Sequence, residues 1–130
     1  MRAKITYRGW AGHFICAHRC RFRLNSLVEY GDIRIVVSTV GLMEGVKGVD
    51  TETFVVIGHE RYYETMAFHA KAIETEKEKF WDADVSRQVC FESDWCINEI
   101  EAENKATKMH FDVVNEVARK LESGKTLEEE

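Results

Sequence analysis

Alternation of apolar and polar residues is the strongest pattern in the chain, and it begins at residue 19. Three arginines fall on one side of an extended segment and three apolar residues fall on the other: Arg19, Arg21, Arg23, Cys20, Phe22 and Leu24. A period of two residues predicts a half-buried strand with a basic outer face. Turn residues at 30–32 and a β-branched run at 33–40 follow, and together they predict a hairpin.

Shorter patterns extend this hairpin into a sheet. Further strands are predicted at 4–7, 13–16, 53–57, 62–72 and 85–91. The segment at 62–72 also fits a helical stripe, but Tyr62, Thr65 and Phe68 are β-formers and favour a strand. The sequence therefore predicts a twisted antiparallel sheet of about five to seven strands over residues 3–92.

The pattern changes to a helical one in the acidic C-terminal part. Ser93 followed by Asp94 is typical of a helix start, which predicts a short helix carrying Trp95 and Ile100. Five apolar residues then recur at spacings of three and four and predict a longer helix: Ala106, Met109, Val113, Val117 and Leu121. Ser123 and Gly124 mark its end.

One α+β domain is therefore predicted over residues 1–130, with C-terminal helices at about 93–123 and a frayed tail at 124–130. A length of 130 residues suits a single domain, and a hydrophobic fraction of 45% is enough for a core. No apolar run approaches the ~20 residues of a membrane helix, and the N-terminus lacks a signal-peptide core. These features favour a soluble protein of the cytoplasm.

Charge is distributed unevenly along the chain. The net charge is −5, yet the first 24 residues contain six Lys or Arg and no acid. A basic patch on an acidic protein suits a small anionic ligand better than long nucleic acid, because the acidic remainder repels an extended phosphate backbone. Alternatively, the basic strand faces the acidic helix of the same or another subunit, and the charge pattern leaves both interpretations open.

Candidate metal and catalytic groups lack the geometry that their chemistry needs. Potential ligands cluster at His13, Cys16, His18 and Cys20. On a strand, this spacing spreads the ligands along one line, whereas zinc needs convergent ones, so the cysteines are interpreted as small core residues. No third group orients a Cys–His pair. The sequence therefore predicts no metal site, no cofactor and no catalytic residue.

Arginines interleaved with aromatic residues favour a nucleotide-like ligand. Guanidinium groups suit phosphate, and flat rings suit a base. Trp10 and Trp81 fall in loop-like segments and are the predicted stacking plates. The predicted phosphate contacts are Arg19, Arg21, Arg23 and Arg87, and His13 is the predicted hydrogen-bonding partner. The polar side of the basic strand is expected to continue across its partner through Arg34 and Ser38, while Phe22, Phe68, Phe91 and Trp95 are predicted to lie in the core.

Several of these segments together resemble a family of small proteins encoded by bacteriophages and prophages. The segments are 8–15, 20–25, 36–41 and 61–68, and the likeness spans roughly residues 5–121. The chain is similar to the Thoeris anti-defence sponges of the first type. The resemblance assigns no ligand contact by position in this chain.

The resemblance implies a non-enzymatic, oligomeric protein that sequesters a cyclic ADP-ribose isomer, an alarm signal made by bacterial TIR-domain enzymes, and releases it unchanged. Some members also hold cyclic oligonucleotides. Helical regions would mediate assembly as a dimer or higher oligomer, with ligand pockets near subunit boundaries. Two alternatives stay open: a nucleic-acid- or protein-binding module that inhibits a host defence complex, or a small nucleotide hydrolase that uses His13 or Asp82 and Asp84.

Overall fold

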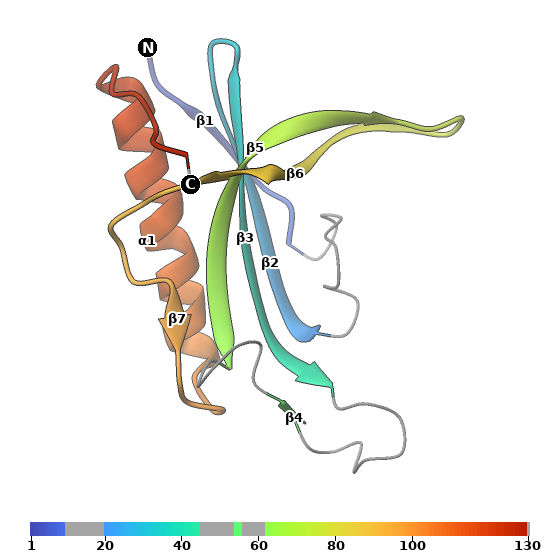
Figure 1. Cartoon of the computed structure of the whole chain (residues 1–130), viewed down its shortest axis with the longest axis vertical. Helices are drawn as coiled ribbons and strands as arrows, with labels where there is room; N and C mark the ends of the chain where they lie inside the picture. Colours follow the sequence, from blue (N-terminus) through green and yellow to red (C-terminus); the bar gives the residue numbers. More distant parts are fainter. Residues whose placement is uncertain (10–19, 45–53, 56–61, 130) are drawn as a thin grey trace.

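A single curved sheet backed by one long helix makes up the part of the chain that the computed structural model describes, which is residues 1–9, 20–44, 54–55 and 62–129 (Figure 1). The elements are β1 (Lys4–Tyr7), β2 (Cys20–Tyr30), β3 (Ile33–Glu44), β4 (Phe54–Val55), β5 (Tyr63–Glu74), β6 (Lys79–Val89), β7 (Cys96–Ile97) and α1 (Glu103–Glu122). This α+β arrangement confirms the predicted fold class.

The sheet is antiparallel and its main path runs β1-β2-β3-β5-β6. The two-residue strand β4 pairs with the end of β3, and β7 pairs with the start of β5. The predicted hairpin is the β2–β3 pair, whose turn uses Gly31 with a φ of 58°. The predicted alternation holds at the start of β2, where Cys20 and Leu24 are buried and Arg21 is exposed, but residues 24–28 are buried on both sides.

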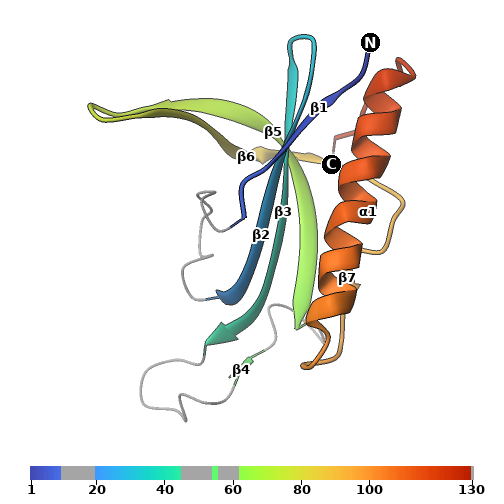
Figure 2. The same ribbon diagram turned by 180° about the vertical axis from the view of Figure 1, so that it is seen from behind.

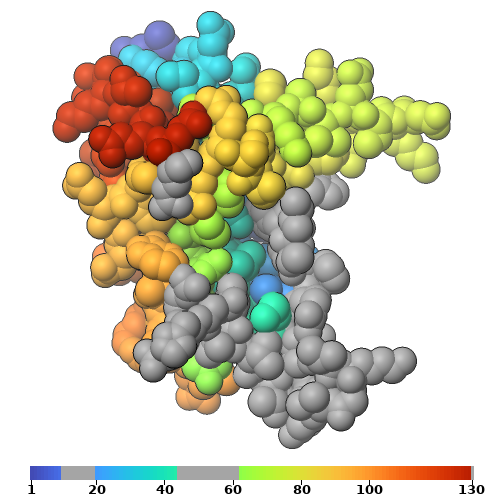
Figure 3. All heavy atoms as spheres, viewed as in Figure 1, coloured from blue at the N-terminus to red at the C-terminus, as the bar shows by residue number. Residues whose placement is uncertain are grey.

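Beyond the sheet, β5 and β6 continue as a two-stranded arm. Both ribbon views show the arm projecting away from α1, and the space-filling view shows it standing out from the rest of the molecule (Figures 1, 2 and 3). The arm begins at a register shift, since Phe68 pairs with Gln88 but Ala70 pairs with Ala83. The extra residues on β6 form a bulge, which bends the pair of strands.

Helix α1 covers one face of the sheet, and the main core lies between them. The predicted apolar stripe from Ala106 to Leu121 is confirmed, because each of its residues is at most 5% exposed. Val113, Val117 and Leu121 pack with Val28, Ile35, Val37 and other residues of the strands, and the first turns of the helix pack with Leu42 and Tyr63. The predicted end of the helix is also confirmed: Gly124 has a φ of 76° and Lys125 N–H donates to the Lys120 carbonyl at 3.0 Å.

A chain of polar side chains is buried between α1 and the central strands. His110 is completely buried, and its two ring nitrogens lie 2.8 Å from Ser26 Oγ and 2.8 Å from Thr39 Oγ1. Thr39 Oγ1 lies 2.6 Å from Thr65 Oγ1. Either neutral tautomer of His110 satisfies this chain. Burial lowers the pKa of His110 to about 4, so the imidazole is neutral near pH 7.

The short helix predicted after Ser93 is absent, and α1 starts only at Glu103. The carboxylate of Glu116 on α1 instead captures this segment, accepting hydrogen bonds from Glu92 N–H, Ser93 N–H and Ser93 Oγ at 2.6–2.8 Å. Burial alone would raise the pKa of Glu116, but these hydrogen bonds and one from Lys120 lower it to about 2. The Ser93 side chain is therefore used to hold a loop against the helix rather than to start a new one.

Two further local predictions were wrong. The C-terminal tail was predicted to fray, but Cys90 N–H donates to the Glu128 carbonyl at 2.8 Å and Val89 pairs with Glu129. The tail therefore extends the edge of β6 as far as residue 129. Trp95 was predicted in the core and is 45% exposed, since its carbonyl accepts a hydrogen bond from Thr65 N–H and the residue follows the sheet edge.

Candidate functional site

The face of the sheet opposite α1 collects polar side chains from the central strands. In an antiparallel pair, residues directly opposite each other point to the same face. Arg23 lies opposite Val40, and Asn25 lies opposite Ser38. Their sequence neighbours Leu24 and Ser26 point to the helix side, where Ser26 bonds His110. We call the side that carries Arg23 and Asn25 the open face.

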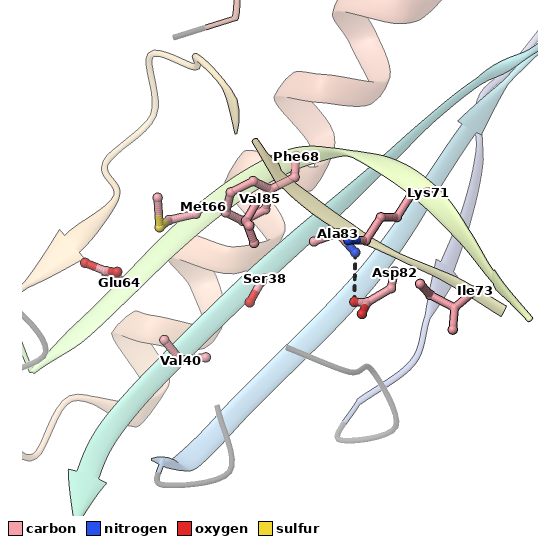
Figure 4. Close-up of a pocket in the computed structure, with 10 residues that line it drawn as sticks. All are labelled: Ser38, Val40, Glu64, Met66, Phe68, Lys71, Ile73, Asp82, Ala83 and Val85. Atoms are coloured by element: carbon pink, nitrogen blue, oxygen red, sulfur yellow. Dashed lines mark hydrogen bonds between the residues drawn. The ribbon is translucent and has the colours of Figure 1, made fainter. Parts of the chain in front are cut away.

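A pocket of about 210 Å³ lies on the open face where the β5–β6 arm bends away. Figure 4 shows its lining side chains on β3, β5 and β6. The lining residues are Ser38, Val40, Glu64, Met66, Phe68, Lys71, Ile73, Asp82, Ala83 and Val85. Apolar groups predominate, and Lys71, Asp82 and Glu64 place charge of both signs around them. The bulge between Phe68 and Ala70 creates this pocket, because it turns the arm over the open face.

Arg8 and Asn25 form a buried polar pair beside this pocket. Arg8 N–H donates to the Asn25 carbonyl at 2.8 Å, which continues the β1–β2 pairing by one residue. The Arg8 Nε donates to Asn25 Oδ1 at 2.6 Å, and Nη1 donates to the carbonyl of Trp81. Two nitrogens of the pair, Arg8 Nη2 and Asn25 Nδ2, are buried without a hydrogen-bond acceptor. A buried donor without an acceptor costs about 1–3 kcal/mol.

The electrostatic setting of Arg8 is unusual for an arginine. Burial lowers the pKa of its guanidinium, and the carboxylates of Asp82 and Glu29 oppose this effect. Neither carboxylate bonds Arg8: Asp82 Oδ1 accepts a hydrogen bond from Ala83 N–H at 2.8 Å, and Glu29 accepts one from Arg34 at 3.1 Å. Arg8 is therefore a partly buried cation that Asp82 and Glu29 attract through space, without a hydrogen bond to either among the described residues.

Of the seven predicted site residues, three lie outside the described residues: Trp10, His13 and Arg19. Arg21 is exposed and Arg23 is half-buried on β2, and alternation along the strand gives both the same face. The structure therefore brings part of the predicted arginine row to the open face.

The two predicted site residues on β6 are in contact with other parts of this chain. Trp81 lies inside the strand rather than in a loop, and the Arg34 guanidinium stands 4.3 Å from its ring centroid. Arg87 lies on the bulge and donates to Glu129 Oε1 at 2.7 Å. Their roles in ligand binding stay predictions.

Sequence reasoning missed Arg8 and Asn25 as a pair. Asn25 lies on the same side of β2 as Arg21 and Arg23, in the part of the strand that is buried, and asparagine is rare inside strands. That combination was the available signal. Arg8 directly follows the strand predicted at 4–7, and nothing in the local pattern shows that it lies beside β2.

Asp82 and Asp84, the carboxylates considered for hydrolysis, have separate local partners. Asp84 Oδ1 accepts hydrogen bonds from Ser86 Oγ at 2.6 Å and from Ser86 N–H at 3.1 Å, and these lower the pKa of Asp84. A lowered pKa makes this carboxyl a poor proton donor at neutral pH. Asp82 and Asp84 are therefore each held by neighbouring groups of β6 itself.

In comparisons with known proteins, the chain matches no family model, no curated protein and no solved structure. The resemblance to Thoeris anti-defence sponges therefore stays a prediction. Across the residues that the structure describes, no helix is long and apolar enough to cross a membrane. The same residues contain no group of three His, Cys, Asp or Glu side chains that could hold a metal ion.

Proposed function

We propose that this protein binds and sequesters a compact phosphate-bearing ligand, a cyclic nucleotide such as a cyclic ADP-ribose isomer, without cleaving it. The observation that carries the proposal is the apolar pocket on the open face with the Arg8–Asn25 pair beside it. An apolar pocket suits a ring, and a guanidinium suits a phosphate. A volume of about 210 Å³ fits one base or sugar rather than a whole dinucleotide, so the rest of the ligand would lie along the open face.

The biological role follows from the family resemblance and is part of the proposal. A phage protein that removes a cyclic nucleotide alarm signal would protect the phage in the cytoplasm of its bacterial host. Tight binding and slow release serve that purpose better than turnover. Assembly into a dimer or higher oligomer would add contacts around a ligand that one pocket only partly encloses.

Calorimetric titration with cyclic ADP-ribose isomers and cyclic oligoadenylates tests the proposal, followed by denaturation and chromatography of the bound ligand. We expect saturable binding of at least one of these ligands and its recovery intact. Binding of none of them, or recovery of a cleaved product, would contradict the proposal. Retention of long single-stranded nucleic acid with steep salt dependence would support a nucleic-acid-binding module instead.

A pair of tryptophan variants locates the ligand. Val85 lines the pocket and is 49% exposed, so Val85→Trp should fill the pocket without disturbing the core. Ile33 is 41% exposed at the tip of the β2–β3 hairpin, so Ile33→Trp is the matched control. We expect Val85→Trp to weaken binding by about tenfold or more, which equals a loss of about 1.4 kcal/mol. Equal affinities of the two variants would place the ligand elsewhere.

A further inference from the structure

Two buried nitrogens on the open face lack the acceptors that buried donors normally have. They are Arg8 Nη2 and Asn25 Nδ2, and Asn25 is completely buried. The hydrogen bond from Arg8 Nε to Asn25 Oδ1 joins their side chains, so the two nitrogens are neighbours. Native proteins leave few buried donors unmatched, and each such case calls for an ion, a water or a ligand as its explanation.

The chemistry of the missing partner follows from the two groups. Both are donors, and one of them belongs to a cation that has no ion pair among the described residues. An oxyanion accepts hydrogen bonds from both nitrogens and balances the charge, whereas a water molecule leaves the charge unbalanced. The two carboxylates whose charges act on Arg8, Asp82 and Glu29, each accept a hydrogen bond from another residue, Ala83 and Arg34 respectively.

We propose that Arg8 and Asn25 form a binding subsite for one phosphate group, which accepts hydrogen bonds from Arg8 Nη2 and Asn25 Nδ2. The subsite deepens the proposed function and rests on it, since it identifies where the phosphate of the sequestered ligand is held. Its position supports this reading, because Asn25 lies directly opposite Ser38, a lining residue of the pocket. Arg8 also bonds the carbonyl of Trp81, which precedes the lining residue Asp82.

Entry to the subsite requires a local rearrangement. Both nitrogens are covered in the structure, so a phosphate reaches them only after neighbouring side chains move apart. Binding that needs such an opening is slow to form and slow to reverse. Slow exchange is the property that a sequestering protein uses.

Inorganic phosphate is the simplest probe of the subsite. We expect sodium phosphate at pH 7 to raise the melting temperature of the protein by about 4 °C at ten times its dissociation constant, relative to sodium chloride at equal ionic strength. Equal melting temperatures in the two salts would overturn the proposal.

The variant Asn25→Asp supplies an oxyanion from the protein itself. Its carboxylate can accept hydrogen bonds from Arg8, so we expect a melting temperature at or above that of the unchanged protein and no response to phosphate. Should Asn25→Asp fail to fold, Arg8→Lys keeps the positive charge but loses the guanidinium fork, and we expect a response weakened by about tenfold. Lys108→Gln, on the exposed side of α1, also removes one positive charge; it is the control and should respond normally. An undiminished phosphate response in folded Asn25→Asp or Arg8→Lys would overturn the subsite.

The subsite and the proposed function can fail independently. A cyclic nucleotide that binds Asn25→Asp as tightly as the unchanged protein removes the subsite and leaves sequestration standing. A phosphate response that Asn25→Asp abolishes, in a protein that binds no cyclic nucleotide, supports the subsite and removes the proposed ligand class.

Discussion

The two faces of the sheet both bury polar side chains, but only one of them satisfies these side chains internally. On the covered face, His110 bonds Ser26 and Thr39, and Thr39 bonds Thr65. On the open face, Arg8 and Asn25 bond each other and still leave one nitrogen each without an acceptor. The first arrangement is complete without a ligand, whereas we propose that a ligand completes the second.

One strand, β2, contributes a buried polar side chain to each of the two faces. Asn25 and Ser26 are adjacent in β2 and completely buried, yet they point to opposite sides. The difference between the faces therefore does not come from burial or from strand geometry. It comes from what lies above each face: α1 brings His110 to the covered face, and the open face has a pocket.

Crowding the covered face should give the largest loss of stability. Gly41 lies opposite Tyr63, and a Cβ at position 41 would stand 2.3 Å from Tyr63 Cδ1. The Tyr63 ring is fully buried, and its hydroxyl donates to the Ile100 carbonyl at 2.6 Å, so it cannot move aside. We expect Gly41→Ala to lower the free energy of unfolding by about 3 kcal/mol, measured by urea titration. Additivity with Tyr63→Ala in the double variant would contradict this steric explanation.

Acid should weaken the covered face through His110. Its pKa is about 4 in the folded protein, compared with 6.5 for an unburied histidine, so the unfolded chain binds a proton first as the pH falls. The contribution is complete above pH 6.5 and is lost between pH 6.5 and about 4, to a total of about 3 kcal/mol. Urea unfolding of the unchanged protein and of His110→Gln across this range isolates the effect. Parallel curves for the two proteins would contradict it.

Removing buried polar side chains should affect the stability of the two faces differently. Thr39→Val leaves His110 and Thr65 without a shared partner, and we expect a loss of about 2 kcal/mol. The double variant Arg8→Met with Asn25→Leu removes both open-face donors together, and we expect stability within about 1 kcal/mol of the unchanged protein. Equal losses from the two changes, measured by urea unfolding, would mean that both faces serve stability alone.

The smallest effect is expected where the C-terminal tail meets β6. Glu129 accepts from Arg87 at 2.7 Å, but the two side chains are 38% and 49% exposed. Exposed ion pairs contribute little and are screened by salt. We expect Glu129→Gln to change the melting temperature by less than about 1 °C, and raised salt to erase even that difference. A shift of several degrees would show that the tail holds β6 in place.

The sequence predicts the parts of this fold whose pattern is local. Alternation at residues 19–24 identifies the start of β2, the β-branched run identifies β3, and the three-and-four spacing identifies α1, whose apolar side packs on the sheet. The segment around Ser93 was assigned wrongly because its hydrogen-bonding partner, Glu116, lies 23 residues further along the chain. A capping signal read from neighbouring residues cannot reveal such a distant competitor.

The candidate site depends even more on distant contacts. Its pocket exists because four residues of β6 between Ala83 and Gln88 bulge opposite β5. Asp84 and Ser86 hydrogen-bond each other in this bulge, but neither Gly nor Pro marks it in the sequence. Arg8 reaches Asn25 from 17 positions away. The alternation of side chains along the two strands did predict that Arg23 and Ser38 would lie on the same face of the sheet, and the β2–β3 register confirms it. Which polar groups on that face lack partners can be read only from the assembled sheet.

The claim that the open face is a ligand site and the covered face is structural can be tested by nuclear magnetic resonance of isotope-labelled protein. The side-chain signals of Asn25 and Arg8 report on the open face, and those of His110 and Thr39 report on the covered face. During titration with a cyclic ADP-ribose isomer, we expect the Asn25 amide and Arg8 guanidinium signals to shift strongly while the His110 and Thr39 signals stay in place. Shifts confined to His110, Thr39 and their neighbours, with Asn25 and Arg8 unmoved, would contradict the account.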